Sequence, residues 1–213
     1  MPSQRTLVIE TATAACSVAL LEDGALVAER HAVVGRGHAE RLVPMIAELP
    51  GEGRSPRILV DCGPGSFTGI RVGIAAALGL AIGWKAQVHG YSSLALVAAA
   101  GFAADAQADA LAVILEGGHG EIFMQAFTRT PLAADGPFES RLPAAALAAL
   151  DGRPAVGDGV RHLAALDPGR ALREALPRAA DARLLPESLT ALPPRPIYGR
   201  APDARTLAER VGA

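Results

Sequence analysis

Hydrophobic positions in the first fifty residues change from a strand-like to a helix-like pattern. Short apolar runs occur at residues 7–9, 16–21 and 25–34, and a Glu-Asp-Gly turn separates the last two. Such runs, joined by tight turns, predict three strands that pair as an antiparallel meander. From residue 38 to residue 49 the apolar side chains recur at helical spacing, which predicts a helix.

A strand, a glycine-rich loop and a long helix are expected next. The apolar run at residues 57–62 leads into Gly-Pro-Gly-Ser-Phe-Thr-Gly at residues 63–69, and a helix follows at residues 69–84. The order of three strands followed by alternating helices and strands is typical of an α/β lobe with a mixed sheet. The remaining elements of this lobe are a strand at residues 87–89 and an apolar helix at residues 92–104.

The pattern continues more weakly after about residue 105. Strands are expected at residues 110–115 and 122–127, and from residue 142 onward alanine-rich helical stretches alternate with proline and glycine. We therefore predict an N-terminal lobe over residues 1–105 that carries the glycine loop. Residues 106–213 are expected to form a smaller, degenerate lobe with a tail that ends in a short polar helix.

Composition and charge exclude several classes of protein. Half of the residues are hydrophobic and 20% are charged, which is too apolar for an intrinsically disordered chain. The net charge of −2 and the aromatic content of 4% do not suit a protein that binds nucleic acid on its own. The first apolar run is too short for a signal peptide. The longest candidate membrane segment, residues 72–84, has 13 uncharged residues and is shorter than the ~18 residues that span a membrane. We expect a cytoplasmic protein with no membrane contact.

The cysteine and histidine positions do not indicate a metal site. Cys16 and Cys62 lie far apart in apolar stretches and lack CxxC spacing. The histidines form no HExxH motif and no i, i+4 pair. We expect two inert core thiols in a reducing compartment, and no metal ligands.

The glycine-rich segment is the first candidate site. A strand that ends in glycines and leads into a helix presents unpaired backbone N–H groups, which suit an anion such as phosphate. The loop lacks the lysine of a P-loop, so capping of the helix by Ser66 or Thr68 is the competing interpretation. Glu10 and Asp61, at the ends of two strands, either hold Mg²⁺ or act as capping or solvated groups. The candidate residues for an anion or nucleotide loop are Glu10, Thr11, Gly63, Gly65, Ser66 and Thr68.

A stripe of small residues marks the helix that follows the loop. Gly69, Gly73, Ala77 and Ala81 recur at i, i+4 positions, so one face of this helix has almost no side chains. Glycine lowers helix propensity, and close packing against another helix would offset that cost. The sequence leaves open whether this neighbour is the helix at residues 38–49 or a second protein.

Four segments together carry a family resemblance. They are Ile-Glu-Thr-Ala-Thr at residues 9–13, the strand at 16–20, the helix start at 38–46, and the glycine loop with the next helix start at 63–73. In this order they resemble the bacterial TsaB (YeaZ) family, and the resemblance extends through residues 120–123 and, more weakly, to Pro-Ile-Tyr-Gly-Arg at residues 196–200. It implies an α/β fold of the actin-like/Hsp70-like (ASKHA) type, with two ribonuclease-H-like lobes, a mixed five-stranded sheet and a reduced second lobe.

The resemblance implies a role in the synthesis of threonylcarbamoyladenosine (t6A) in tRNA. A family member is a non-catalytic dimerisation subunit that binds and activates its catalytic paralogue, TsaD. Together with the ATPase TsaE, the paralogue transfers threonylcarbamoyl to N6 of adenosine 37 in tRNAs that read ANN codons. The subunit then contacts tRNA only indirectly, and ATP or ADP with Mg²⁺ is expected only in the assembled complex. Homodimerisation of the free chain is left open.

The same resemblance argues against catalysis by this chain alone. The paralogue carries a metal-binding H-x-x-x-H pair where this sequence has Tyr-Ser-Ser-Leu-Ala-Leu at residues 91–96, so we expect no catalytic residue here. This chain departs from the family in having Glu10 where Asp is usual, and in its short segment at residues 49–56.

The alternative is a small ASKHA-type ATPase or phosphotransferase that uses Glu10, Asp61 and the loop at residues 63–69. A metalloprotease would require tightly bound zinc.

The resemblance also places the partner interface on the two helices at residues 38–49 and 69–84. The small-residue stripe is the sequence feature that supports this placement. The residues expected at the interface are His38, Arg41, Leu42, Met45, Gly69, Arg71, Val72, Gly73, Ala76, Ala77 and Leu80.

Overall fold

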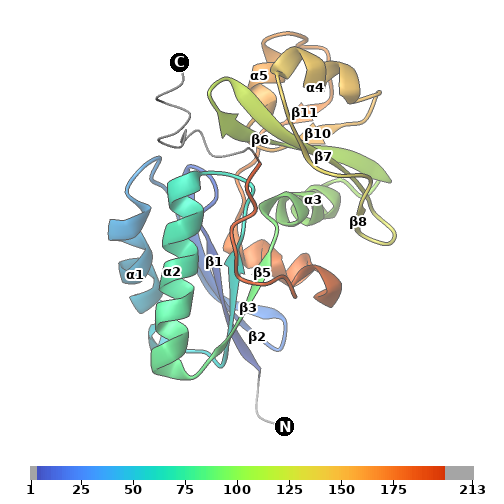
Figure 1. Cartoon of the computed structure of the whole chain (residues 1–213). Coiled ribbons are helices and arrows are strands. Elements are labelled where there is room, and N and C mark those ends of the chain that lie inside the picture. The colour runs from blue at the N-terminus through green and yellow to red at the C-terminus, as the bar shows by residue number, and fades with distance from the viewer. Residues whose placement is uncertain (1–3, 200–213) are drawn as a thin grey trace, which may run out of the picture.

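Five strands form the sheet of the N-terminal lobe in a computed structural model that describes residues 4–199 (Figure 1). They are β1 (Arg5–Glu10), β2 (Ala15–Glu22), β3 (Ala25–Val33), β4 (Arg57–Asp61) and β5 (Gln87–Tyr91), in the spatial order β3-β2-β1-β4-β5. β1, β2 and β3 pair antiparallel, whereas β1, β4 and β5 pair parallel. The predicted meander and the mixed five-stranded sheet are confirmed.

Three helices cover the two faces of this sheet. α1 (His38–Ala47) and α2 (Phe67–Trp84) pack on one face, and α3 (Ser93–Ala104) packs on the other. Successive side chains of a strand point to opposite faces, so Leu7 and Ile9 contact the first pair of helices while Val8 belongs to the core around α3. α2 begins two residues earlier than predicted, because the Ser66 side chain caps it.

A second, smaller sheet forms the other lobe. Its strand order is β11-β10-β6-β7-β8, with β9 paired to β7, and four of its strands have only two or three residues. Two short helices, α4 (Pro143–Ala149) and α5 (Val160–Ala164), pack on its outer face. The strands are β6 (Ala110–Gly118), β7 (Glu121–Thr128), β8 (Ala133–Ala134), β9 (Glu139–Arg141), β10 (Ala155–Val156) and β11 (Leu172–Arg173).

The helix α3 lies between the two sheets. Nine of its twelve residues are buried, and it shares one hydrophobic core with Leu59 of the first sheet and with Leu115 and Phe127 of the second. Its sequence is hydrophobic on all sides, as expected of a helix without a solvent-facing stripe. The two lobes therefore share a core.

The C-terminal part of the described chain returns to the first lobe. Two short 3-10 helices, η2 (Ala179–Leu184) and η3 (Glu187–Leu189), lie near the first sheet, where the Ala179 N–H donates to Ser17 Oγ (3.0 Å). The second sheet begins after residue 105, as the predicted division requires, but residues 179–197 contact the first lobe. The division of the chain at residue 105 therefore stays a prediction. The predicted C-terminal helix lies outside the described residues.

The small-residue stripe of α2 faces the sheet. A Cβ atom at Gly69 would overlap the Thr11 carbonyl oxygen, and one at Gly73 would overlap Thr11 Oγ1. Thr11 Oγ1 also donates a hydrogen bond to the Gly69 carbonyl (2.9 Å), and Ala77 is completely buried. The expectation that these glycines pack against a helix is wrong, because the turn after β1 occupies that position.

By length and composition alone, α2 could cross a membrane. It has 18 residues and a mean hydropathy of 1.5, and the uncharged segment noted in the sequence is only part of it. In the structure, Ile70 and Ile74 join the glycines in a buried inner face against the sheet. The helix is thus an integral part of the first lobe.

Replacing Gly69 with alanine is expected to destabilise the fold by about 1–3 kcal/mol, because the added methyl group meets a backbone carbonyl that cannot rotate away. The matched control is Gly79→Ala on the same helix, where nothing lies within 4 Å of the new methyl group. That change should stabilise the protein by about 0.5–1 kcal/mol. Urea unfolding measures the free energy of unfolding of both variants. Equal changes in the same direction for Gly69→Ala and Gly79→Ala would contradict this packing.

Candidate functional site

Two acidic side chains lie at the ends of adjacent parallel strands. Glu10 ends β1 and Asp61 ends β4, and both are completely buried. Glu10 accepts hydrogen bonds from the Ala12 N–H (2.9 Å) and the Tyr91 hydroxyl (3.1 Å). Asp61 Oδ1 accepts one from the Gly63 N–H (2.8 Å), whereas its Oδ2 has no hydrogen-bond partner among the described residues.

Burial changes the acidity of both groups. It raises the pKa of Asp61 to about 7. It also raises the pKa of Glu10 well above its ordinary value, and the nearby charge of Asp61 adds to this effect. Asp158 of the second lobe, whose own pKa burial raises to about 6, contributes in the same direction. Because two buried carboxylates cannot both ionise cheaply, the pair retains a proton near neutral pH.

The glycine loop is closed by the chain itself. The Ser66 N–H donates to the Ala12 carbonyl (2.6 Å), and the Gly69 N–H donates to Ser66 Oγ (3.2 Å). A Cβ at Gly65 would overlap the Ala12 carbonyl. A carbonyl oxygen at this position repels an anion, so the geometry favours the capping interpretation for Ser66.

The candidate anion-loop residues are therefore only partly accessible. Glu10, Thr11 and Gly63 are buried, Gly65 is half-buried, and only Ser66 and Thr68 are exposed. A role of these residues in nucleotide binding stays a prediction.

The two thiols lie in the core, as the sequence predicts. Cys16 and Cys62 are free and buried, and burial raises the pKa of the first to about 11 and of the second to about 12. Thiols with such pKa values are poor nucleophiles and poor metal ligands at neutral pH. Within residues 4–199, no group of three or more His, Cys, Asp or Glu side chains is arranged to hold a metal ion.

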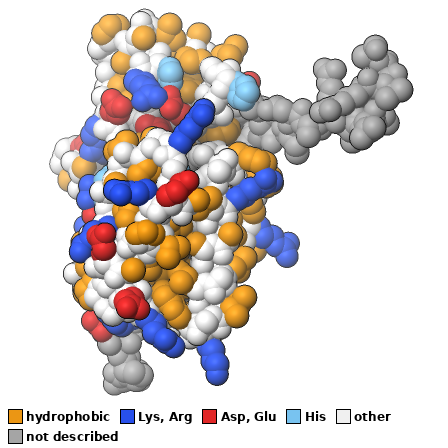
Figure 2. Space-filling model, turned by 90° about the vertical axis from the view of Figure 1, so that its left-hand side faces the viewer, with side chains coloured by type: hydrophobic (Ala, Val, Ile, Leu, Met, Phe, Trp, Pro, Cys, Tyr) orange, Lys and Arg blue, Asp and Glu red, His pale blue; other side chains and the backbone are white. Residues whose placement is uncertain are grey.

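The outer face of α2 is apolar and exposed. Opposite the glycines runs a row of exposed residues that we call the outward stripe: Phe67, Arg71, Ala75, Leu78 and Ile82. Ile82 is 83% exposed and Phe67 53%. Figure 2 shows hydrophobic side chains gathered on this side of the molecule, with charged ones around them. Contiguous exposed apolar surface of this kind is typical of interaction sites.

The predicted interface residues divide into inner and outer ones. Arg41 and Arg71 are exposed, and Val72, Ala76 and Leu80 are half-buried. The other six are buried inside the chain: His38, Leu42, Met45, Gly69, Gly73 and Ala77. His38 fixes the turn between β1 and β2, because its Nε2 donates to the carbonyls of Thr13 (3.0 Å) and Ala15 (3.2 Å).

Sequence reasoning missed the exposed apolar residues Val43, Phe67, Leu78 and Ile82. A signal for three of them was present in the sequence. Once the glycines of α2 are assigned to the inner face, helical periodicity places positions 67, 78 and 82 on the opposite face.

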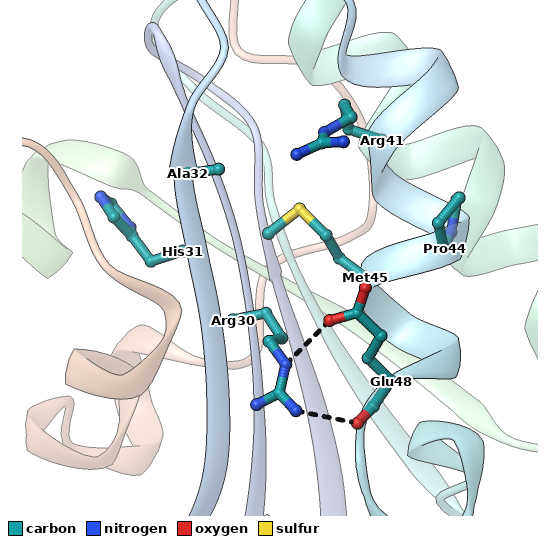
Figure 3. A pocket seen from close by; sticks show the side chains of 7 residues that line it. All are labelled: Arg30, His31, Ala32, Arg41, Pro44, Met45 and Glu48. Atoms are coloured by element: carbon teal, nitrogen blue, oxygen red, sulfur yellow. Dashed lines mark hydrogen bonds and ion pairs between the residues drawn. The ribbon is translucent and has the colours of Figure 1, made fainter.

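A pocket of about 170 Å³ lies beside α1, between this helix and β3 (Figure 3). Arg30 is held at one end by Glu48, with its Nε 2.9 Å from Glu48 Oε2. Met45 lies in the middle of the pocket, and the Arg41 side chain extends over its other end. The polar side chains that line this pocket, Arg30, Arg41 and Glu48, therefore lie next to α1.

The buried carboxylates should make stability depend on pH. Their pKa values are higher in the folded chain than in the unfolded one. At pH values between the unfolded and the folded pKa, the folded state therefore binds more protons than the unfolded state. The free energy of unfolding consequently falls as pH rises from about 4 to about 7. Asp61→Asn keeps the acceptor for Gly63 but does not titrate. It should flatten this fall by up to about 1.4 kcal/mol per pH unit.

Urea unfolding at pH 4, 5, 6 and 7 checks this expectation, with Glu52→Gln at an exposed position as the control. Identical slopes for the wild type and Asp61→Asn would show that Asp61 ionises in the folded chain as it does in water.

Comparison with known protein families matches residues 31–133 to the model of TsaD, tRNA N6-adenosine threonylcarbamoyltransferase. The tRNA threonylcarbamoyladenosine biosynthesis protein TsaB of Escherichia coli is 37% identical over 130 residues, which are 59% of this chain and 55% of that protein. The TsaB of Haemophilus influenzae is 34% identical over 63% of this chain and 58% of its own length. The alignments thus span little more than half of these curated relatives.

Two further proteins match nearly the whole chain. An uncharacterized protein of Mycobacterium tuberculosis is 31% identical over 95% of this chain and 94% of its own length. The structure of YeaZ from Pseudomonas aeruginosa superposes with a TM-score of 0.76 at 26% identity, covering 92% of this chain and 99% of the YeaZ chain. Together with the relatives named TsaB, these matches show that this chain belongs to the TsaB (YeaZ) family and has an α/β, two-lobe fold of the ASKHA type.

Proposed function

We propose that this chain is a non-catalytic, cytoplasmic subunit of the machinery that forms t6A in tRNA. In this role it binds and activates the catalytic paralogue TsaD, which adds threonylcarbamoyl to N6 of adenosine 37 in tRNAs that read ANN codons. TsaE and tRNA join through the complex and not through this chain alone. The names of its relatives support the pathway, and the outward stripe of α2 carries the proposed role within it.

The outward stripe has the properties of a protein-binding surface. Leu78 and Ile82 are exposed on α2, and Val43 of α1 is 53% exposed. Burying an exposed leucine or isoleucine side chain contributes about 1.5–3 kcal/mol, so a few such residues can anchor an interface. A standard interface of ~1,600 Å² requires a contiguous surface, and two neighbouring helices offer one.

The partner is inferred from the family match. Residues 31–133, which include α1 and α2, match the family model of TsaD itself. The paralogue therefore has helices like these, and two similar faces can pack around an approximate two-fold axis. The same surface would allow the free chain to form a homodimer.

The buried positions support a role without catalysis. Tyr91 is committed to the Ile9 carbonyl and to Glu10, and Ser93 Oγ donates to the Pro64 carbonyl (2.8 Å). These residues begin the segment that corresponds to the paralogue's histidine pair. A protonated acid pair closed off by the glycine loop is also a poor ligand for Mg²⁺.

The competing hypothesis is a small ATPase that uses Glu10, Asp61 and the loop at residues 63–69. It requires the pure chain to bind ATP with Mg²⁺ at micromolar concentration or tighter. Titration calorimetry on the free chain separates the two functions, because the proposed subunit binds nucleotide only after the complex has assembled.

Arginine in place of Ile82 should abolish the complex with TsaD from the same organism. The change puts a charge on the most exposed apolar side chain of the outward stripe, and loss of a principal binding residue typically costs about 2 kcal/mol or more. Light scattering coupled to size exclusion, with both proteins at micromolar concentration, is expected to show a 1:1 complex for the wild type and separate proteins for Ile82→Arg.

Leu142→Arg is the matched control, since Leu142 is also an exposed apolar residue but lies in the second lobe. The control should form the complex normally. An intact 1:1 complex with Ile82→Arg would rule out the outward stripe as the interface.

A further inference from the structure

Residues 190–199, which we call the C-terminal strap, are fixed to the first lobe by a series of hydrogen bonds. Arg57 donates to Thr190 Oγ1 (3.1 Å). Leu192 and Gly90 exchange two backbone hydrogen bonds of 2.6 and 3.0 Å. Further along, the Ile197 N–H donates to the Cys62 carbonyl (2.7 Å). The strap therefore delivers its last residues to a defined place.

That place is the start of α2. Arg71 donates two hydrogen bonds to the Tyr198 hydroxyl, from Nε (3.2 Å) and Nη2 (2.9 Å). The Arg71 guanidinium carbon also lies 3.5 Å from the centre of the Phe67 ring, and the two aromatic rings are 5.7 Å apart. These three residues form what we call the aromatic cluster, and each side chain holds the other two.

The aromatic cluster is ordered and yet exposed. Phe67 is 53% exposed and Tyr198 is 46% exposed, so the interactions within the cluster leave much of both side chains in water. Tyrosine and arginine are over-represented among the residues that dominate binding energy at interfaces. Because these side chains are already held in place, a partner that covers them loses little conformational freedom.

The cluster is continuous with the surface already assigned to the partner. Phe67 and Arg71 are the first two residues of the outward stripe, which continues along α2 to Ile82. Tyr198 extends this stripe sideways with a residue that is more than a hundred positions away in the sequence. The docking surface is thus built from the helices and from the strap.

We propose that Tyr198, positioned by Arg71 and Phe67, is a direct contact of TsaD and one of the principal binding residues of the interface. This inference rests on the proposed function and adds a partner-binding residue outside the two helices. Arg71 uses two of its five N–H groups on Tyr198, so the partner surface that fits here offers an apolar group to the rings and a carboxylate or carbonyl oxygen to the guanidinium.

The test is a set of affinity measurements by titration calorimetry with TsaD from the same organism. Tyr198→Ala should weaken Kd at least tenfold, which corresponds to about 1.4 kcal/mol. Tyr198→Phe keeps the ring and loses only the acceptor for Arg71, so it should weaken Kd less than Tyr198→Ala. Leu166→Ala, another exposed apolar residue located after α5, is the control and should leave Kd unchanged.

Circular dichroism and the unfolding midpoint of each free variant show whether the chain still folds. If Tyr198→Ala were misfolded, Tyr198→Phe and Phe67→Ala would carry the test, because each removes one part of the cluster. A Kd within twofold of the wild type for a folded Tyr198→Ala would overturn this inference.

The outcomes also separate this inference from the proposed function. If the complex forms and Ile82→Arg breaks it while Tyr198→Ala does not, the helices bind TsaD without the strap, and only the present inference fails. If the wild-type chain forms no complex with TsaD, the proposed function itself fails.

Discussion

The close approach of α2 to the turn after β1 determines how the first lobe is built. At Gly65, Gly69 and Gly73 the backbone lies so near to Thr11 and Ala12 that no side chain fits between them. The resulting hydrogen bonds supply the cap and the first turn of α2 with partners from the turn. Because this contact fixes the rotation of the helix about its axis, it also decides that Leu78 and Ile82 point to solvent.

The same contact changes the role of the strand ends. In open α/β sheets the crevice beyond the carboxyl ends of the strands is the usual place for a ligand. Here the turn after β1 and the glycine loop close over that place, and Glu10 and Asp61 remain inside as a buried acidic pair with raised pKa values. A row of exposed apolar residues lies instead along the outer face of α2. In the function proposed above, the binding surface is this exposed face of α2 and not the strand ends.

Much of this arrangement can be predicted from the sequence. The meander, the long helices and a cap at Ser66 or Thr68 follow from local patterns, and these are reliable because each is written in one continuous segment of the sequence. The inward direction of Gly69 and Gly73 could not be predicted, since a stripe of small residues indicates close contact without indicating with what. The return of the strap was also invisible, because the contacts of Leu192 and Tyr198 are single long-range interactions with no period. The short strands β10 and β11 have too few residues to produce any pattern.

The position of α3 has a consequence for how the chain behaves as a unit. Its buried residues contact both sheets, so neither lobe can detach without exposing a helix that is hydrophobic on every side. Two lobes that share a core in this way melt together and not one after the other. The chain is in this sense one cooperative body, in which the first sheet lies between the core under α1 and α2 and the core that α3 shares with the second sheet.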